Sequence, residues 1–206
     1  MKPYWFLRLI IGRAVKRYTK CITGMENIPA QGPFLIAVNH TDWLDGLYLM
    51  LLISEKTNQK INIVTKSKNY YIWFPGLSIY VDKKNRSRAI DCAVEKLKKG
   101  GIVTFFPEGR RQTKEELGQG KTGLVRAALR AQVPILPVGL RCPGHWAFLI
   151  SLILLLFRSK RLEMHIGQPM NFSQELHQDD SEELIRRASK KVMLKIAKLA
   201  NKKYIY

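Results

Sequence analysis

The residues best suited to chemistry are a histidine and a carboxylate five positions apart. His40 and Asp45 lie in the sequence N-H-T-D-W-L-D at residues 39–45, directly after a short apolar run. Histidine is the natural general base near neutral pH, and a carboxylate can hold its ring in one tautomer and stabilise the cation. Five positions span about 140° around a helix axis, so the pair cannot share a helix face. We therefore expect His40 in the turn before a helix and Asp45 in its first turns, reaching back.

Two interpretations of this pair are open. In the first, His40 and Asp45 act in catalysis; in the second, Asp42 caps the helix and Asp45 only complements the helix dipole. A second cluster favours catalysis. The sequence F-P-E-G-R-R at residues 106–111 follows another apolar run, and arginine binds phosphate oxygens in a bidentate geometry. Glu108 in this cluster could orient a glycerol hydroxyl, although a charged surface turn is the structural alternative.

A sheet is needed to bring these two clusters together. Short apolar runs bounded by turn residues predict strands at residues 34–38, 61–65, 102–106, 133–138 and 161–166. Helical spacing of apolar residues predicts helices at residues 44–53, 87–99, 123–131 and 181–203. Alternating strands and helices predict a single α/β domain with a mostly parallel or mixed sheet flanked by helices. Such sheets place chemistry beyond the carboxyl ends of their strands, where both clusters lie.

The charge of the chain limits the classes of partner. The 206 residues contain 35 Lys and Arg but 16 Asp and Glu, a net charge of +19. Such an excess attracts anions, which include anionic lipid, phosphorylated substrates, an acidic carrier protein and nucleic acid. A nucleic-acid-binding protein is the hypothesis from a different class, but the basic residues are dispersed and no binding motif is present. The three cysteines and four histidines lack metal-ligand spacing, so we expect no metal ion.

Three segments have the composition of membrane-surface elements. Residues 1–23 predict a basic amphipathic helix, residues 145–157 are uncharged and apolar, and residues 181–203 form a long basic helix. A bilayer span needs about 20 apolar residues, which none of the three supplies. Each terminal helix could equally pack on the core. The segment 145–157 is either interfacial or a core helix, and we favour insertion because Pro143-Gly144 separates it from the preceding strand. Residues 24–206, which include the second and third of these segments, predict one catalytic domain.

The motifs in their order resemble a known family. N-H-T-D-W-L-D, then F-P-E-G-R-R, then V-P-I-L-P-V at residues 133–138 resemble the 1-acylglycerol-3-phosphate acyltransferase (lysophosphatidic acid acyltransferase) family. That family carries N-H-x-S-x-x-D, F-P-E-G-T-R and a proline block in this order. The resemblance also covers K-T-G at residues 121–123 and R-L-E-M-H-I-G-Q-P-M at residues 161–170, and it extends over roughly residues 24–172.

The resemblance implies roles for individual residues. His40 would be the general base and Asp45 its orienting carboxylate. The substrate site would be formed by the F-P-E-G-R-R motif and by cationic residues after two other strands and before a helix: Glu108, Gly109, Arg110, Arg111, Lys66, Lys83 and Lys121. Three positions depart from the family pattern, with Asp42 in place of serine, Arg110 in place of a small residue and Lys83 in place of arginine. These departures leave the exact acceptor open.

The resemblance also implies the reaction and its location. The enzyme would transfer a fatty acyl group from acyl-CoA or acyl-carrier protein to a hydroxyl of a glycerol-phosphate-type lipid, without cofactor or metal because a thioester is already activated. A lyso-amino-acid lipid and another lysophospholipid are alternative acceptors. The protein would be membrane-associated, monotopic or peripheral, on the cytoplasmic face.

Overall fold

The centre of the protein is a mixed β-sheet. The computed structural model describes residues 5–66, 77–82, 84–112, 114–142, 148–158, 160–172 and 181–206, and for residues 6–8 the backbone alone. Within these residues the strands are β1 (Thr19–Thr23), β2 (Phe34–Val38), β3 (Ile61–Thr65), β4 (Ser78–Tyr80), β5 (Ile102–Phe105), β6 (Ile135–Arg141) and β7 (Leu162–Ile166). They form one seven-stranded sheet in the order β1-β7-β6-β2-β5-β3-β4. Every neighbouring pair is parallel except β6 and β7, which are antiparallel.

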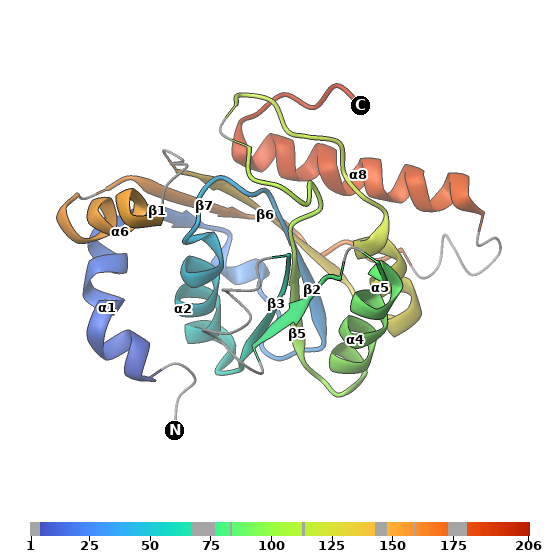
Figure 1. Cartoon of the computed structure of the whole chain (residues 1–206), viewed down its shortest axis with the longest axis horizontal. Coiled ribbons are helices and arrows are strands. Elements are labelled where there is room, and N and C mark those ends of the chain that lie inside the picture. Colours follow the sequence, from blue (N-terminus) through green and yellow to red (C-terminus); the bar gives the residue numbers. More distant parts are fainter. Residues whose placement is uncertain are drawn as a thin grey trace.

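Helices cover both faces of this sheet (Figure 1). The helices in the described residues are α1 (Trp5–Tyr18), α2 (Asp45–Thr57), α4 (Arg86–Lys98), α5 (Gly123–Ala131), α6 (Phe148–Phe157) and α8 (Glu182–Ala200). One core cluster joins α1, α2 and α6 to one sheet face, and the other joins α4, α5 and α8 to the opposite face. The predicted single α/β domain with a mixed sheet is confirmed.

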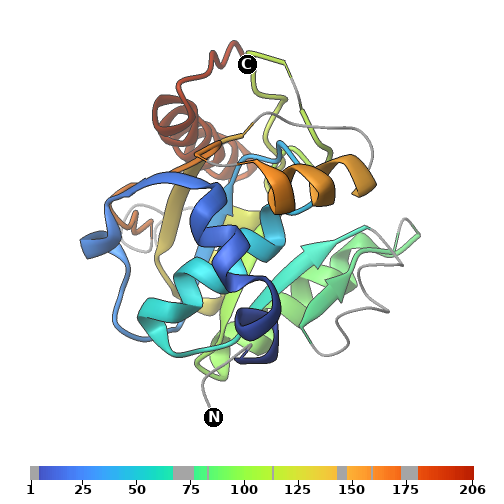
Figure 2. The same cartoon turned by 90° about the vertical axis from the view of Figure 1, so that its left-hand side faces the viewer.

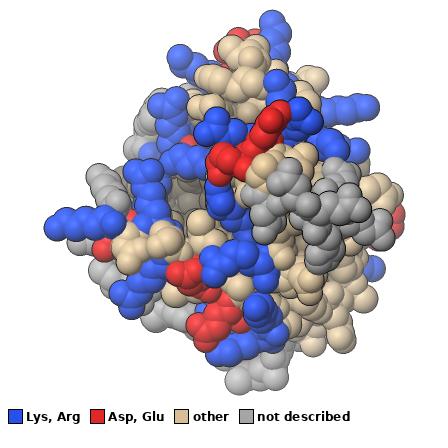
Figure 3. Space-filling model, turned by 90° about the vertical axis from the view of Figure 1, so that its right-hand side faces the viewer, with Lys and Arg blue, Asp and Glu red and all other residues tan. Residues whose placement is uncertain are grey.

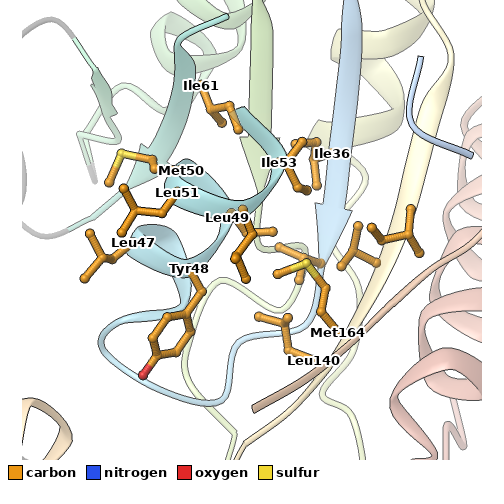
Figure 4. Packing of buried hydrophobic residues seen from close by; sticks show 14 of the residues in the cluster. Ile36, Leu47, Tyr48, Leu49, Met50, Leu51, Ile53, Ile61, Leu140 and Met164 are labelled. Atoms are coloured by element: carbon orange, nitrogen blue, oxygen red, sulfur yellow. The ribbon is translucent and has the colours of Figure 1, made fainter. Parts of the chain in front are cut away.

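The central strand β2 shows why the sequence folds this way. Its five residues are all fully buried, as expected for a strand covered on both faces. Because side chains alternate along a strand, Phe34, Ile36 and Val38 belong to one core cluster, while Leu35 and Ala37 belong to the other. Leu49 and Ile53 of α2 pack over the same face as Ile36 (Figure 4). The strand and the helix that carry the N-H-T-D-W-L-D motif are therefore fixed to each other by the core.

The predicted N-terminal helix over residues 1–23 requires a correction. Helix α1 ends at Tyr18, and residues 19–23 form the edge strand β1, parallel to β7. The hydroxyl of Thr19 donates to the carbonyl oxygen of Val15 at 2.7 Å, a contact typical of helix ends, and β-branched residues favour a strand. Val15 and Tyr18 are buried in the core. The N-terminal segment is thus part of the α/β domain.

The basic C-terminal helix packs on the core. Helix α8 buries an apolar stripe that includes Ile185, Val192 and Ile196, while its basic residues face outward. This outcome matches the core-packing alternative for residues 181–203, because the apolar face is already covered by the sheet and α5.

Helix α8 approaches strand β6 so closely that only glycine fits at the contact. A Cβ added to Gly139 would lie 2.4 Å from the backbone nitrogen of Ala200 and from the carbonyl carbon of Leu199. We expect Gly139→Ala to lower the free energy of unfolding by roughly 1–3 kcal/mol or more, because the helix must move off the sheet. Urea denaturation measures this change. Gly123→Ala is the control, since its added Cβ would meet only Ile90 at 3.5 Å. Equal stability of the two variants would contradict the close approach.

Candidate active site

The loop between β2 and α2 begins with a buried asparagine. The side-chain amide of Asn39 donates to the carbonyl oxygen of Leu140 at 2.9 Å, and its oxygen accepts from the Leu140 backbone N–H at 2.7 Å. These two bonds join the end of β2 to the neighbouring strand β6, and Asn39 has no exposed surface. The sequence analysis quoted Asn39 within the motif without assigning it a role. Its role is to fix the point at which the chain leaves the sheet toward His40.

His40 and Asp45 form the predicted pair. The Nδ1 atom of His40 lies 2.8 Å from Oδ2 of Asp45, which is the first residue of α2 and is fully buried. The same carboxylate accepts from the backbone N–H of Thr41 at 2.6 Å and of Asp42 at 2.9 Å, and from the Thr41 hydroxyl at 3.1 Å. Because a carboxylate accepts, Nδ1 carries the proton and Nε2 keeps its lone pair. The pair has the geometry of an oriented general base.

The alternative interpretation, in which Asp42 caps the helix and Asp45 only complements the helix dipole, does not describe the loop. The N-cap residue of α2 is Leu44, and its side chain makes no cap hydrogen bond. Asp42 instead accepts from the Leu44 backbone N–H through Oδ1 at 2.8 Å. Asp45 pairs with His40 rather than only facing the helix dipole, so the dyad predicted from the sequence is present.

Glu108 has a different place from the one expected. Its side chain is 4% exposed, and its two oxygens accept from the backbone N–H groups of His40 at 3.2 Å and Gly118 at 2.7 Å. Burial raises the pKa of its carboxyl, while these two hydrogen bonds lower it. Glu108 is not among the residues lining the cavity. The expectation that it orients a glycerol hydroxyl is therefore replaced by a positioning role, in which it joins the two motif loops behind His40.

Further contacts hold the second loop against the histidine. The His40 ring stacks on Phe106, with ring centroids 4.2 Å apart. The backbone N–H of Gln112 donates to the His40 carbonyl oxygen at 2.7 Å. Together with Glu108, these contacts attach the F-P-E-G-R-R loop to His40 by its ring and by both of its backbone polar groups.

Arg111 lies over an aromatic ring of the first loop. Its guanidinium carbon is 4.0 Å from the centroid of the Trp43 ring, a cation–π contact. Burial lowers the pKa of Arg111, while Asp42 and Asp45 raise it. The sequence offered no signal for the contact with Trp43, because the two residues are far apart in the chain.

Two lysines converge on Gly109. The Lys66 ammonium donates to the Gly109 carbonyl oxygen at 2.8 Å. A Cβ at Gly109 would lie 2.8 Å from Nζ of Lys121 and 3.2 Å from Nζ of Lys66, and the residue has a φ of 65°. Glycine is therefore required here for both conformation and space. The third predicted lysine, Lys83, lies outside the described residues.

These side chains surround one cavity of about 860 Å³. His40 lines it and is 23% exposed at its side chain. Of the described residues that line it, none is acidic and six are basic: Lys66, Arg86, Arg110, Arg111, Lys114 and Lys121. Other residues that line the cavity are apolar, and they include Ile63, Val64, Val81, Ala89, Ile90 and Leu124. Lys and Arg also crowd the nearby face that carries α4, α5 and α8 (Figure 3). The cavity thus suits a molecule with an anionic group and an apolar chain.

A cluster of possible metal ligands lies away from this cavity. Within the described residues, donor atoms of Cys21, Glu163 and His165 lie within 4.8 Å of one another. Glu163 already pairs with Lys20 at 2.6 Å and with Arg141 at 3.4 Å. Because Lys20 and Arg141 already pair with the Glu163 carboxylate, their positive charges oppose the binding of a metal ion there. The absence of a metal requirement stays a prediction.

The chain is similar in sequence to known acyltransferases. The chain is 32% identical over 138 residues to the chloroplastic 1-acyl-sn-glycerol-3-phosphate acyltransferase of Brassica napus, covering 62% of this chain and 38% of that protein. It is 28% identical over 177 residues to the 1-acyl-sn-glycerol-3-phosphate acyltransferase of Bacillus subtilis, covering 82% and 80%. The chain thus spans well under half of the plant protein but most of the bacterial one.

A solved structure shows the fold, and a family model shows the family. The crystal structure of the 1-acyl-sn-glycerophosphate acyltransferase PlsC from Thermotoga maritima matches 97% of this chain and 83% of that one, with a TM-score of 0.60 and 20% identity. At this identity the likeness shows the fold. The family model described as Acyltransferase matches residues 20–141, which is more than half of the chain and contains both motifs. The chain belongs to the acyltransferase family.

Proposed function

We propose that the protein transfers an acyl group from a thioester to a hydroxyl of 1-acylglycerol-3-phosphate or a closely related glycerophospholipid precursor. The observation that carries this proposal is that the His40–Asp45 pair opens into the same cavity as Arg111, Lys66 and Lys121. A base beside a cluster of cations suits an acceptor that carries both a hydroxyl and a phosphate. The plant and bacterial relatives are 1-acyl-sn-glycerol-3-phosphate acyltransferases, which supports the same acceptor.

The chemistry needs one proton to move twice. Nε2 of His40 takes the proton of the acceptor hydroxyl as that oxygen attacks the thioester carbonyl. Asp45 stabilises the resulting imidazolium, and cavity cations offset the negative charge of the tetrahedral intermediate. When the C–S bond breaks, the imidazolium returns the proton to the leaving thiolate. General-base assistance of this kind is worth roughly 10²–10⁴ in rate. No step needs an acyl-enzyme, metal or cofactor.

Three of the cations that line the cavity lie in two places, beside Trp43 and beside Gly109. Arg111 contacts the loop of His40 through Trp43, and its guanidinium can bind the acceptor phosphate in a bidentate geometry. Lys66 and Lys121 flank Gly109 and attract further phosphate oxygens of either substrate. The donor is acyl-CoA or acyl-carrier protein, both of which carry phosphate on the thiol arm. A lyso-amino-acid lipid without phosphate is disfavoured by this lining.

Contact with the bilayer is assigned to α6 and α1. Among the described residues, no helix combines the length and apolarity that crossing a membrane requires. Only Ser151 and Leu155 of α6 are buried, and its exposed large apolar residues are Phe148, Leu149, Ile150, Ile153, Leu156 and Phe157. Helix α1 lies beside it and exposes Trp5, Leu9 and Ile10 (Figure 2). Residues 145–147 of the predicted apolar segment lie outside the described residues. A core helix would not expose so much apolar surface, so we assign α6 to the interface.

Basic residues next to this surface supply an electrostatic contribution. Exposed cations at the ends of the two helices are Arg13, Lys16, Arg17, Arg158, Lys160 and Arg161. They would lie at the level of anionic headgroups while the apolar side chains enter the bilayer. We place the protein on the cytoplasmic face, as a monotopic or peripheral enzyme, which suits an odd number of cysteines whose spacing shows no disulfide framework.

The first prediction tests the general base. His40→Ala should lower turnover by roughly 10²–10⁴, because the proton then has no acceptor. Thermal unfolding should show a folded protein of lower stability, since Asp45 loses one donor but keeps the backbone donors of Thr41 and Asp42. His165→Ala, which removes a histidine outside the cavity, is the matched control and should keep near-normal turnover. Steady-state assays with acyl-CoA and acyl-carrier-protein thioesters against a panel of lysolipids give the numbers. Full activity of a folded His40→Ala protein would refute the mechanism.

The second prediction concerns the acceptor phosphate. Arg111→Ala should raise the acceptor KM roughly tenfold to a hundredfold, since a charge-assisted hydrogen-bonding group is lost. Arg111→Lys should recover only part of this, because lysine lacks the planar fork. Arg110→Thr, at the neighbouring position, should have a milder effect. If the change appears in the donor KM instead, the arginine serves the other substrate.

The third prediction tests attachment to the bilayer. Leu149→Lys combined with Phe157→Lys replaces two side chains of α6 that are 63% and 77% exposed. The double variant should become extractable by high salt, because the electrostatic attraction that remains is screened within about a Debye length. The wild type should need detergent. Leu194→Lys on α8, at a residue that is 47% exposed on the other side of the sheet, is the control. Retention of the double variant in high salt would exclude α6 as the anchor.

A further inference from the structure

Helix α6 is hydrogen-bonded to the catalytic loop. Ser151, one of the two buried residues of α6, donates from its hydroxyl to Oδ2 of Asp42 at 2.7 Å. The backbone N–H of Asp42 in turn donates to the same oxygen of Asp45 that pairs with His40. A continuous series of contacts therefore leads from the exposed apolar helix to the general base. Asp42 is also the position at which this chain departs from the serine of the family pattern.

A second contact leads from α6 to the phosphate-binding residue. Phe148 meets Trp43 edge to face, with ring centroids 6.4 Å apart and an interplanar angle of 85°. Trp43 holds the guanidinium of Arg111 against its ring at 4.0 Å. Ser151 and Phe148 are three positions apart on one side of the helix, so one helix turn contacts both parts of the site.

The position of Asp42 makes the hydrogen bond from Ser151 strong. Asp42 is 2% exposed, and its surroundings include Tyr18, Tyr48 and Cys142. Burial raises the pKa of Cys142 to about 12, and the negative charges of Asp45 and Asp42 add to this effect. A carboxylate in such a site is stabilised by each donor that it keeps, and removing one is costly. The loop conformation is therefore sensitive to where α6 lies.

Helix α6 itself is weakly attached to the rest of the protein. It buries two of its ten residues and packs at the edge of the domain against α1. An element with so few buried side chains has a low local stability, and its position responds to its surroundings. Insertion of its exposed apolar residues into a bilayer would favour one position over the others.

We propose that Asp42, Trp43 and Ser151 are positioning residues that couple the seating of α6 on a lipid bilayer to the geometry of His40–Asp45 and of Arg111. Docking on lipid thus raises turnover as well as bringing the enzyme to its substrate. This inference rests on the acyltransferase function proposed above, and it gives the departure at Asp42 a specific role.

The experiment separates activation of the enzyme by the bilayer from delivery of the lipid substrate by the bilayer. The acceptor is a short-chain 1-acylglycerol-3-phosphate that stays dissolved as a monomer, and the donor is a short-chain acyl-CoA. Turnover is measured without vesicles and with saturating unilamellar vesicles of phosphatidylcholine and phosphatidylglycerol, and vesicle binding is measured by flotation. For the wild type we expect kcat to rise roughly tenfold on vesicle binding, the scale of one charged hydrogen bond.

Variants on the two contacts should give different kinetics. Ser151→Ala should bind vesicles normally but lose the increase in kcat, and Ser151→Thr, which keeps the hydroxyl, should restore it. Phe148→Leu keeps an apolar surface but loses the contact with Trp43, so it should raise the acceptor KM. Phe157→Ala is the matched control on the same helix. It should weaken vesicle binding and leave kcat at saturating vesicles unchanged.

Each outcome decides between the two proposals. If the wild type acylates no acceptor under either condition, the proposed function is wrong. If it acylates but vesicles leave kcat unchanged, or if Ser151→Ala responds to vesicles like the wild type, the coupling is overturned and the function stands. Thermal unfolding reports whether Ser151→Ala folds. Should it not fold, Phe148→Leu decides, because its side chain is half exposed, and an unchanged acceptor KM would overturn the coupling.

Discussion

The active site depends on one buried carboxylate at the start of a helix. Asp45 has no exposed surface and accepts hydrogen bonds from His40, Thr41 and Asp42. A carboxylate in that position is stable only when its oxygens have donors, so the preceding loop must wrap around it. Wrapping presents the backbone N–H groups of the loop and orients the imidazole in the same step. The orientation of the His40 ring and the hydrogen bonding of the buried charge therefore depend on the same loop conformation. The start of this loop is fixed by the two hydrogen bonds between Asn39 and Leu140.

A second buried carboxylate connects this loop to the substrate loop. Glu108 accepts from the backbone of His40 and of Gly118, and the Phe106 ring stacks on the imidazole. The two motif loops are thereby one unit, although they follow different strands. The basic residues can all face the cavity because the acids of both motifs lie behind it, each satisfied by backbone donors. Such an arrangement concentrates positive charge where the two proposed anionic substrates would meet.

Sequence reasoning located the motifs on the correct elements, because apolar runs and turn residues are local signals. Strand β3 and helix α5 have the predicted bounds. The spacing of His40 and Asp45 leaves their pairing open, and the second cluster and the family resemblance favour it; the two side chains do meet. Strand β1 was missed because its pairing with β7 joins residues about 140 positions apart and its sequence continues a helical pattern. The role of Glu108 was misjudged for a related reason. An acid beside arginines looks like a substrate ligand until its burial and its two backbone donors are known.

The arrangement of α6 follows from the two phases in which the proposed substrates reside. A soluble thioester and a lipid acceptor can meet at one histidine only if the loop carrying it lies between the aqueous cavity and the membrane-facing edge. The loop at residues 39–45 meets this requirement, since His40 lines the cavity and Asp42 and Trp43 contact α6. A helix that faces lipid must expose apolar residues and so gives up most of its packing on the core. Its remaining contacts are then few, and in this protein those with the loop involve Asp42 and Trp43, close in sequence to His40.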